Sequence, residues 1–280
     1  VDTEYLEPEG PFGESHGHVA LEEFNMPMRV TAITHRKNPI IPSYLSQVAP
    51  SESSVIKRVA YEPLFTSHLR NTLGIRGVKK VALHEPLTGL LRVTVVTLEK
   101  GTLRTEVWRA LQGAAFFKGD CGKICIAVNE DIDVDNADAL LWAMAYRMNP
   151  VKDVQIVPHR GQGHGPKREH DQEEDSTLLM DATMKDDMPP LALPKKEYME
   201  RAKAIWQQLD LGTLQPQPPW FGYSLGDWLP QWDEAARNAA QGRYLDNGRI
   251  SEKLRQKGLK PETKYRPAKE YSGKVENDKG

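Results

Sequence analysis

Two glutamates near the start of the chain, Glu9 and Glu14, have a spacing that can serve acid–base chemistry. In a regular strand, side chains five positions apart point to opposite faces, so these carboxylates would not act on one substrate. The intervening residues 10–13 read GPFG, and proline and glycine interrupt strands and favour bends. We therefore predict that a turn at residues 10–13 brings both carboxylates to one site.

Two acids in one partly dry site would take different roles. Because their negative charges repel, one keeps its proton near neutral pH while the other stays ionised. The protonated acid can then act as a general acid. An exposed acidic turn without a catalytic role is the alternative that the spacing leaves open.

A metal site is a competing interpretation of the same segment. Glu14, His16 and His18 are spaced by two, so in a strand they would share one face, as carboxylate and imidazole ligands of zinc or iron often do. His35 and His159 could complete the ligand set. Only the local spacing supports this metal-dependent enzyme.

The composition is that of a globular protein. The chain has 280 residues, a formal net charge of −2 and 27% charged residues, which fits one large or two ordinary domains. The charge gives no basic field to attract nucleic acid, and the apolar runs are shorter than the roughly 20 residues that span a bilayer. We predict a cytoplasmic protein without nucleic-acid or membrane partners. Cys121 and Cys125 would share a strand face as reduced core residues.

The first part of the chain reads as β structure followed by helix. Alternating hydrophobicity predicts a strand over residues 28–36, and the strand-like start at Val1 suggests that the chain continues something upstream. Residues 50–73 are typical of a helical connector, with Ser51 as N-cap and Pro63 opening a second helical segment.

Strand and helix patterns alternate from residue 78 onward, which predicts a sheet with packed helices and the fold class α+β. The glycine-rich and then charged run that begins near His159 is predicted to be a loop. We predict strands over 78–86, 90–100, 123–130, 154–158 and 176–183, and helices over 102–117, 136–148 and 195–211.

Residues 211–257 combine prolines with Trp220, Trp228 and Trp232, and a helical stretch follows at 235–245. Exposed aromatic residues without their own core need a surface to cover, so we predict an arm that wraps a neighbouring subunit. Packing of this arm on its own chain is equally open. The charged tail, residues 258–280, is predicted to be disordered.

Four segments resemble, in order, parts of the UbiD family of prenylated-flavin-dependent decarboxylases. They are EPEGPFGESHG, VTAITHRKNPIIPS, NEDIDVDNADALLWAMAYRMNP and LLMDAT. The resemblance implies that the chain is the latter part of a family member and divides it into five parts. These are the end of a prenylated-FMN-binding split barrel (1–49), a helical connector (50–77), a mixed α/β oligomerisation domain (78–210), a C-terminal aromatic and helical arm (211–257) and the tail (258–280).

The resemblance also implies a reaction, namely reversible non-oxidative decarboxylation of an aromatic or α,β-unsaturated carboxylic acid with prenylated FMN as electron sink. Glu14 would be the proton donor, and Glu9 would hold the arginine of a Glu-Arg-Glu network. A flavin prenyltransferase would supply the cofactor, and copies of the protein would form a homodimer or a larger oligomer.

Several family features fall outside this chain or match it only at single residues. The network arginine and the ligands for Mn or Mg and for K⁺ lie upstream of the EGPFGE motif, so this isolated portion is expected to be inactive alone. Ile56 matches a substrate-facing position and Lys118 a lysine that approaches the cofactor, although a helix-core residue and a solvated lysine are open alternatives. The loop from His159 to Lys167 is a candidate lid.

A non-catalytic role is the remaining alternative. Multisubunit carboxylases of this family contain related subunits, and a chain that lacks half of a cofactor site could be an assembly subunit.

Overall fold

The computed structural model describes residues 7–9, 12–14, 16–20, 23–84, 91–119, 122–161, 174–185, 196–212 and 230–249, with isolated positions between 188 and 194. The chain divides into two compact units. The first comprises Val1–Asp186 and Pro194–Tyr223, and the second comprises Asp187–Leu193 and Ser224–Gly280. Each unit is described by itself.

The first unit begins with a hairpin made of two antiparallel pairs. Strand β1 (Glu7–Glu9) pairs with β4 (Glu23–Asn25), and β2 (Phe12–Gly13) pairs with β3 (Val19–Ala20). Both pairs keep one register, because Glu9 lies opposite Glu23 and Gly13, four positions further on, lies opposite Val19. The predicted split barrel is represented here by this hairpin, and the barrel itself stays a prediction.

The chain reverses between Glu14 and His18. The Glu14 amide donates to the His18 carbonyl at 2.9 Å, and the Gly17 amide donates to the Glu14 carbonyl at 2.9 Å. Gly17 has φ +85°, the left-handed conformation that three-residue hairpin loops place on glycine. Gly17 thus has the positive φ of this hairpin loop, whereas the predicted bend at residues 10–13 falls partly on residues 10 and 11, outside the described residues, and stays a prediction.

Residues 26–50 contain no helix or strand. The strand predicted for residues 28–36 is wrong, and its apolar side chains are exposed, with Val30 at 62% and Ile33 at 80%. A strand needs a neighbouring backbone to accept and donate its hydrogen bonds, and none of the described segments pairs with residues 28–36.

The predicted connector is helix α1 (Glu52–Ser67), continued by a π-helical turn η1 (His68–Thr72). Ser51 is its N-cap as predicted: the Ser54 amide donates to the Ser51 hydroxyl, and the Ser51 amide donates to Ser54 Oγ at 2.9 Å. Pro63 does not open a second helix but lies inside α1. It removes the helical donor for the carbonyl of Val59, which is 68% exposed, so water can replace that donor.

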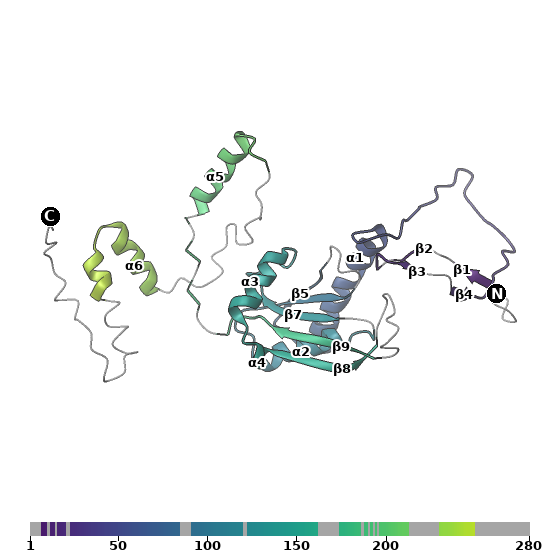
Figure 1. Cartoon of the computed structure of the whole chain (residues 1–280), viewed down its shortest axis with the longest axis horizontal. Helices are drawn as coiled ribbons and strands as arrows, with labels where there is room; N and C mark the ends of the chain where they lie inside the picture. Colours follow the sequence, from purple (N-terminus) through teal and green to yellow (C-terminus); the bar gives the residue numbers. More distant parts are fainter. Residues whose placement is uncertain are drawn as a thin grey trace, which may run out of the picture. The chain divides into compact units, whose positions relative to one another are not determined.

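A five-stranded mixed sheet forms the centre of this unit, in the order β5-β6-β7-β9-β8 (Figure 1). The inner strands run parallel, and β5 and β8 are antiparallel edges. Every strand and both long helices lie where the alternation of patterns predicts them, which confirms the mixed α/β sheet. The elements are β5 (Val78–Leu83), β6 (Val93–Leu98), α2 (Arg104–Ala115), β7 (Ile124–Asn129), α3 (Ala137–Arg147), α4 (Pro150–Asp153), β8 (Val154–Arg160) and β9 (Asp175–Asp181).

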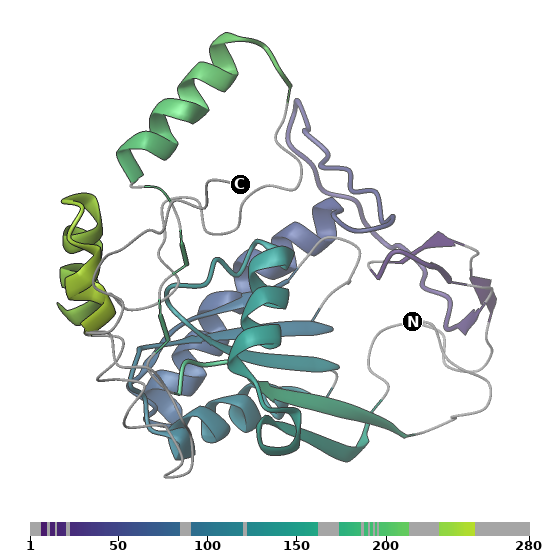
Figure 2. The same cartoon turned by 60° about the vertical axis from the view of Figure 1, so that its left-hand side comes forward.

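The core of this unit lies between the sheet and α1, η1 and α2 (Figure 2). Phe65, Leu69 and Leu111 are completely buried there. Cys125 on β7 is buried in the same core, as predicted, while Cys121 lies outside the described residues.

Beyond the sheet, α5 (Lys196–Gln208) is the predicted amphipathic helix, and α6 (Pro230–Ala240) begins the predicted helical stretch of the arm earlier than expected. Residues 244–249 are also helical. Trp220, Trp228 and the tail 258–280 lie outside the described residues. Within the described ranges, no helix has the length and apolar character needed to cross a membrane.

Candidate functional site

Glu14 lies at the tip of the hairpin and is partly buried. For Glu9 the structure describes the backbone, in β1 opposite Glu23, but not the side chain. Because a flat ladder of this register would point side chains five apart to opposite faces, their convergence requires a bend between residues 9 and 14. The meeting of the two carboxylates therefore stays a prediction.

His16 and His18 flank Gly17 in the hairpin loop and do not share a strand face. The His18 amide donates to His16 Nδ1 at 3.2 Å, and the two ring centres lie 5.3 Å apart. The strand geometry behind the metal interpretation is therefore wrong, because the chain reverses where the ligands were expected to alternate. In the described part of the chain no three His, Cys, Asp or Glu side chains are grouped to hold a metal ion.

The hairpin tip packs against the segment that leads into α1. A Cβ on Gly13 would overlap the Ser46 carbonyl oxygen, and a Cβ on Gly17 would lie 2.9 Å from Val48 Cα. The backbones are thus in direct contact. The next residue, Ala49, is 4% exposed. Glu14, which follows Gly13, therefore lies close to the segment that precedes α1.

Ile56 lies in the first half of α1 and is 51% exposed. Val55 and Val59 are exposed beside it, at 47% and 68%. Ile56 is therefore not a helix-core residue, and it belongs to an apolar surface that a ligand could cover. Its contact with a substrate stays a prediction.

Lys118, between α2 and β7, is held against α1. Its Nζ donates to the Tyr61 hydroxyl at 2.8 Å and lies 4.5 Å from the centre of the Tyr61 ring. The preceding Phe117 packs on Phe65, with ring centres 4.4 Å apart. Lys118 is thus not a solvated strand-end residue. Lys118 contacts α1 at Tyr61, and Ile56 lies five residues earlier in the same helix. The contact of Lys118 with a cofactor stays a prediction.

A second polar link ties α1 to the sheet domain. Arg58 donates to Glu62 Oε1 at 2.8 Å and also pairs with Asp135, which follows β7. The hydrogen bond to Glu62 raises the pKa of Arg58, with a further contribution from Asp135, so the guanidinium stays charged. The sequence analysis did not identify this link, since Arg58 and Asp135 are far apart in the chain.

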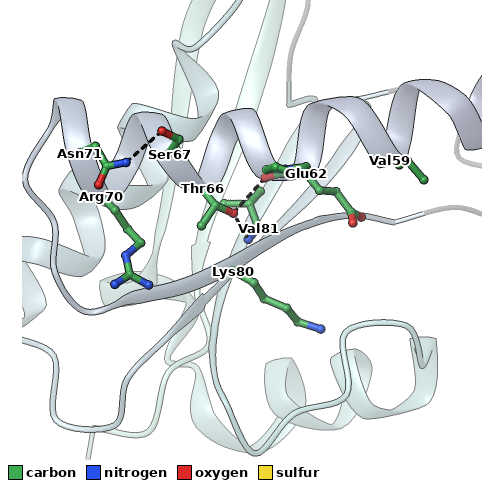
Figure 3. Close-up of a pocket in the computed structure, with 9 residues that line it drawn as sticks. Val59, Glu62, Thr66, Ser67, Arg70, Asn71, Lys80 and Val81 are labelled. Atoms are coloured by element: carbon green, nitrogen blue, oxygen red, sulfur yellow. Dashed lines mark hydrogen bonds between the residues drawn. The ribbon is translucent and has the colours of Figure 1, made fainter.

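The same helix closes the β5 edge of the sheet. Glu62 Oε1 accepts the Leu83 amide at 2.9 Å, and Thr66 Oγ1 accepts the Val81 amide at 3.0 Å. Beside these contacts lies an open groove of about 670 Å³ (Figure 3). It is lined by Val59, Glu62, Pro63, Thr66, Ser67, Arg70, Asn71, Lys80 and Val81.

The candidate lid is described only at its start. His159, in β8, has φ +59° at a register shift in the pairing with β9, and its Nδ1 lies 3.0 Å from Glu174 Oε2. Residues 162–167 lie outside the described residues, so the lid stays a prediction.

Two domain patterns of one family match this chain in sequence. Residues 1–48 match the 3-octaprenyl-4-hydroxybenzoate carboxy-lyase Rift-related domain, and residues 54–182 match the C-terminal domain of the same carboxy-lyase. Together they cover more than half of the chain. The chain belongs to the UbiD family.

Curated relatives have modest identity. An uncharacterized protein of Archaeoglobus fulgidus is 28% identical over 162 residues, which are 56% of this chain and 32% of that protein. The uncharacterized protein sll0936 of Synechocystis is 25% identical over 158 residues, which are 54% of this chain and 30% of that protein. The chain therefore spans about a third of the length of these relatives.

Solved structures share the fold. The UbiD-class enzyme HmfF from Pelotomaculum thermopropionicum, in complex with FMN, has a TM-score of 0.55 and 25% identity, covering 70% of this chain and 41% of that one. Vanillic acid decarboxylase from Sedimentibacter hydroxybenzoicus, in closed form, has a TM-score of 0.55 and 21% identity, covering 73% and 44%. The second likeness shows the fold alone.

Proposed function

We propose that this chain is the carboxyl-terminal part of a decarboxylase that uses prenylated FMN. The reaction is reversible, non-oxidative decarboxylation of an aromatic or α,β-unsaturated carboxylic acid. Glu14 is the proton donor, and Glu9 holds the charge network beside it. The protein works as a homodimer or larger oligomer, and a flavin prenyltransferase supplies the cofactor.

The order of the two family matches carries this proposal. The Rift-related match ends at residue 48 and the C-terminal match begins at residue 54, so one chain joins both parts of a carboxy-lyase. Glu14 lies in the first part, and its hairpin packs on the residues that lead to the second.

The described residues fit the rim of a flavin site. Lys118 offers one partly buried ammonium group that can pair with a phosphate, and Glu14 offers one partly buried carboxyl group. They offer no group of three side chains for a divalent metal, so no step is assigned to Mn, Mg or K⁺. When bound, prenylated FMN supplies the electron sink that allows the bond to the carboxylate to break.

Glu14 then completes the reaction. Its hydroxyl gives a proton to the carbon that the departing carbon dioxide leaves behind, and the resulting carboxylate takes a new proton from solvent. In the reverse direction the Glu14 carboxylate removes that proton. The apolar surface around Ile56 helps to exclude water from the reacting carbon.

The test is Glu14→Gln in the full-length, flavin-loaded protein, since this isolated portion is expected to be inactive alone. The amide cannot donate a carboxylic proton, so kcat should fall by about 10²–10⁴-fold, and exchange of the product's ring or vinyl proton with deuterated solvent should fall equally. The absorbance spectrum of the bound flavin should be unchanged. Glu52→Gln, at the exposed start of α1, is the matched control and should keep full turnover.

Normal turnover in the Glu14 variant would remove this residue as the donor. If the unmodified full-length protein binds prenylated FMN but turns over no aromatic or acrylic acid, the assembly-subunit alternative replaces the enzyme.

A further inference from the structure

We propose that Gly13 is a positioning residue for Glu14. Its missing side chain lets the hairpin tip sit directly on the backbone of residues 46–48, and this contact fixes Glu14 relative to α1. The catalytic part of this inference rests on the proposed function, whereas the contact itself does not.

The hairpin cannot hold Glu14 in place by itself. Strands β2 and β3 are two residues long, and an isolated two-stranded hairpin is at best marginally stable in water. Val19 in β3 is 65% exposed, so it contributes little burial here. The tip therefore needs an outside surface, and residues 46–48 provide one.

The approach at Gly13 leaves no room for a side chain. A Cβ there would overlap the Ser46 carbonyl oxygen and lie 3.1 Å from the Ser46 carbonyl carbon. Both partners are backbone, so no change of rotamer can relieve the overlap, and the hairpin would have to retreat by roughly 1 Å. Gly13 has no positive φ, unlike Gly17, so an alanine at position 13 is opposed by the contact and not by its own backbone conformation.

The surface beneath the tip is tied to the start of α1. Ala49 and Ser51 are each 4% exposed, and Ser54 is completely buried. Ser51 and Ser54 form the capping box, and the Val55 amide donates to the Ser51 carbonyl at 3.0 Å. The chain that directly follows residues 46–48 is therefore held by buried contacts and by the helix cap. Glu14 directly follows Gly13, and its amide donates a hydrogen bond to the His18 carbonyl. The position of Gly13 on residues 46–48 therefore fixes the position of the Glu14 backbone.

Gly13→Ala tests the catalytic consequence in the full-length, flavin-loaded protein. Because a displacement of this size can cost a catalytic group about 10²-fold in rate, kcat should fall by about 10²-fold. KM should change by less than about twofold, since the groups that bind the substrate do not move. Gly248→Ala is the matched control, because a Cβ there meets nothing within 4 Å. A rise in KM with an unchanged kcat would overturn the positioning role.

Hydrogen exchange tests the contact without any activity. In Gly13→Ala the amides of Glu14, Gly17 and Val55 should exchange about tenfold faster, whereas Gly248→Ala should leave them unchanged. Unchanged exchange at all three amides overturns the proposal.

The two readouts separate the contact from the reaction. If the three amides exchange faster in Gly13→Ala and the kcat for decarboxylation also falls, the whole proposal is supported. Faster exchange in a protein that shows no decarboxylation at all would keep the contact and overturn the role of Glu14. A thermal melt shared by Gly13→Ala and the unmodified protein confirms that the sheet domain is folded in the variant.

Discussion

Substitution of Lys118 tests the proposed pairing of its ammonium group with the flavin phosphate separately from proton transfer by Glu14. In Lys118→Met the phosphate of a bound flavin would lose one charge-assisted hydrogen bond, so the affinity for FMN should fall by about 10–100-fold. Titration of the protein with FMN, followed by the quenching of flavin fluorescence, measures this change. Lys80→Met, in the exposed groove beside β5, is the control and should bind FMN normally. Equal affinities for both variants would remove Lys118 from the cofactor site.

Single residues were predictable where a motif contains them, and contacts between distant residues were not. Glu14 was proposed as a site residue from a segment that resembles the family, and Ile56 and Lys118 from single matching positions, and their roles stay predictions. Asp135, which binds Arg58, lies in one of the segments that resemble the family and Tyr61, which binds Lys118, does not, but no motif marks either residue as the partner in its pair. Such pairs are brought together only by the packing of α1 on the sheet domain, and neither helical nor strand periodicity carries that information.

Glu62 is expected to stabilise the contact between α1 and β5. Its carboxylate accepts both the Leu83 amide and the Arg58 guanidinium. In Glu62→Ala these donors lose their acceptor, so the free energy of unfolding should fall by about 1–3 kcal/mol. Urea unfolding followed by circular dichroism measures this, and Glu130→Ala, an exposed glutamate after β7, is the control. A loss no larger than that of the control would show that water replaces the Glu62 carboxylate.

The elements of the sheet domain were predictable because most of its strands and helices bury an apolar pattern, although β8 does not. The predictions that were wrong concern segments in which the local sequence pattern favours one structure and the available backbone hydrogen bonds favour another. Residues 28–36 alternate like a strand but have no described partner, and Pro63 sits inside a helix because its missing donor affects only an exposed carbonyl. The reversal of the chain at Glu14–His18 was not predicted, because Gly17, which has the positive φ of this loop, was not singled out from the sequence.

At the scale of the whole molecule, Lys185 holds the end of the sheet together. Its ammonium lies 3.3 Å from Asp153 and 3.6 Å from Asp181, whose side chains are only 3% and 1% exposed, and it donates to the Arg147 carbonyl at 3.0 Å. In Lys185→Met the two buried carboxylates lose this ammonium but keep other donors, such as Arg104 on Asp153, so the free energy of unfolding should fall by about 1–3 kcal/mol.

Thermal and urea unfolding of Lys185→Met provide the measurement. Lys152→Met changes an exposed lysine of α4 and should be nearly neutral. If both variants unfold alike, the ion pairs of Lys185 contribute no net stability. The sequence gives no signal for this network, because its members come from α3, α4 and the end of β9.

Both edge strands of the five-stranded sheet, β5 and β8, are protected against pairing with another strand, and by different means. At β5 the outward amides of Val81 and Leu83 are already occupied by α1, while at β8 Pro158 has no amide hydrogen and His159 turns the backbone away. At these positions the backbone of the five-stranded sheet does not offer amide hydrogen bonds to a strand of a second molecule. Edge-to-edge pairing of this sheet should therefore be disfavoured even in a concentrated solution.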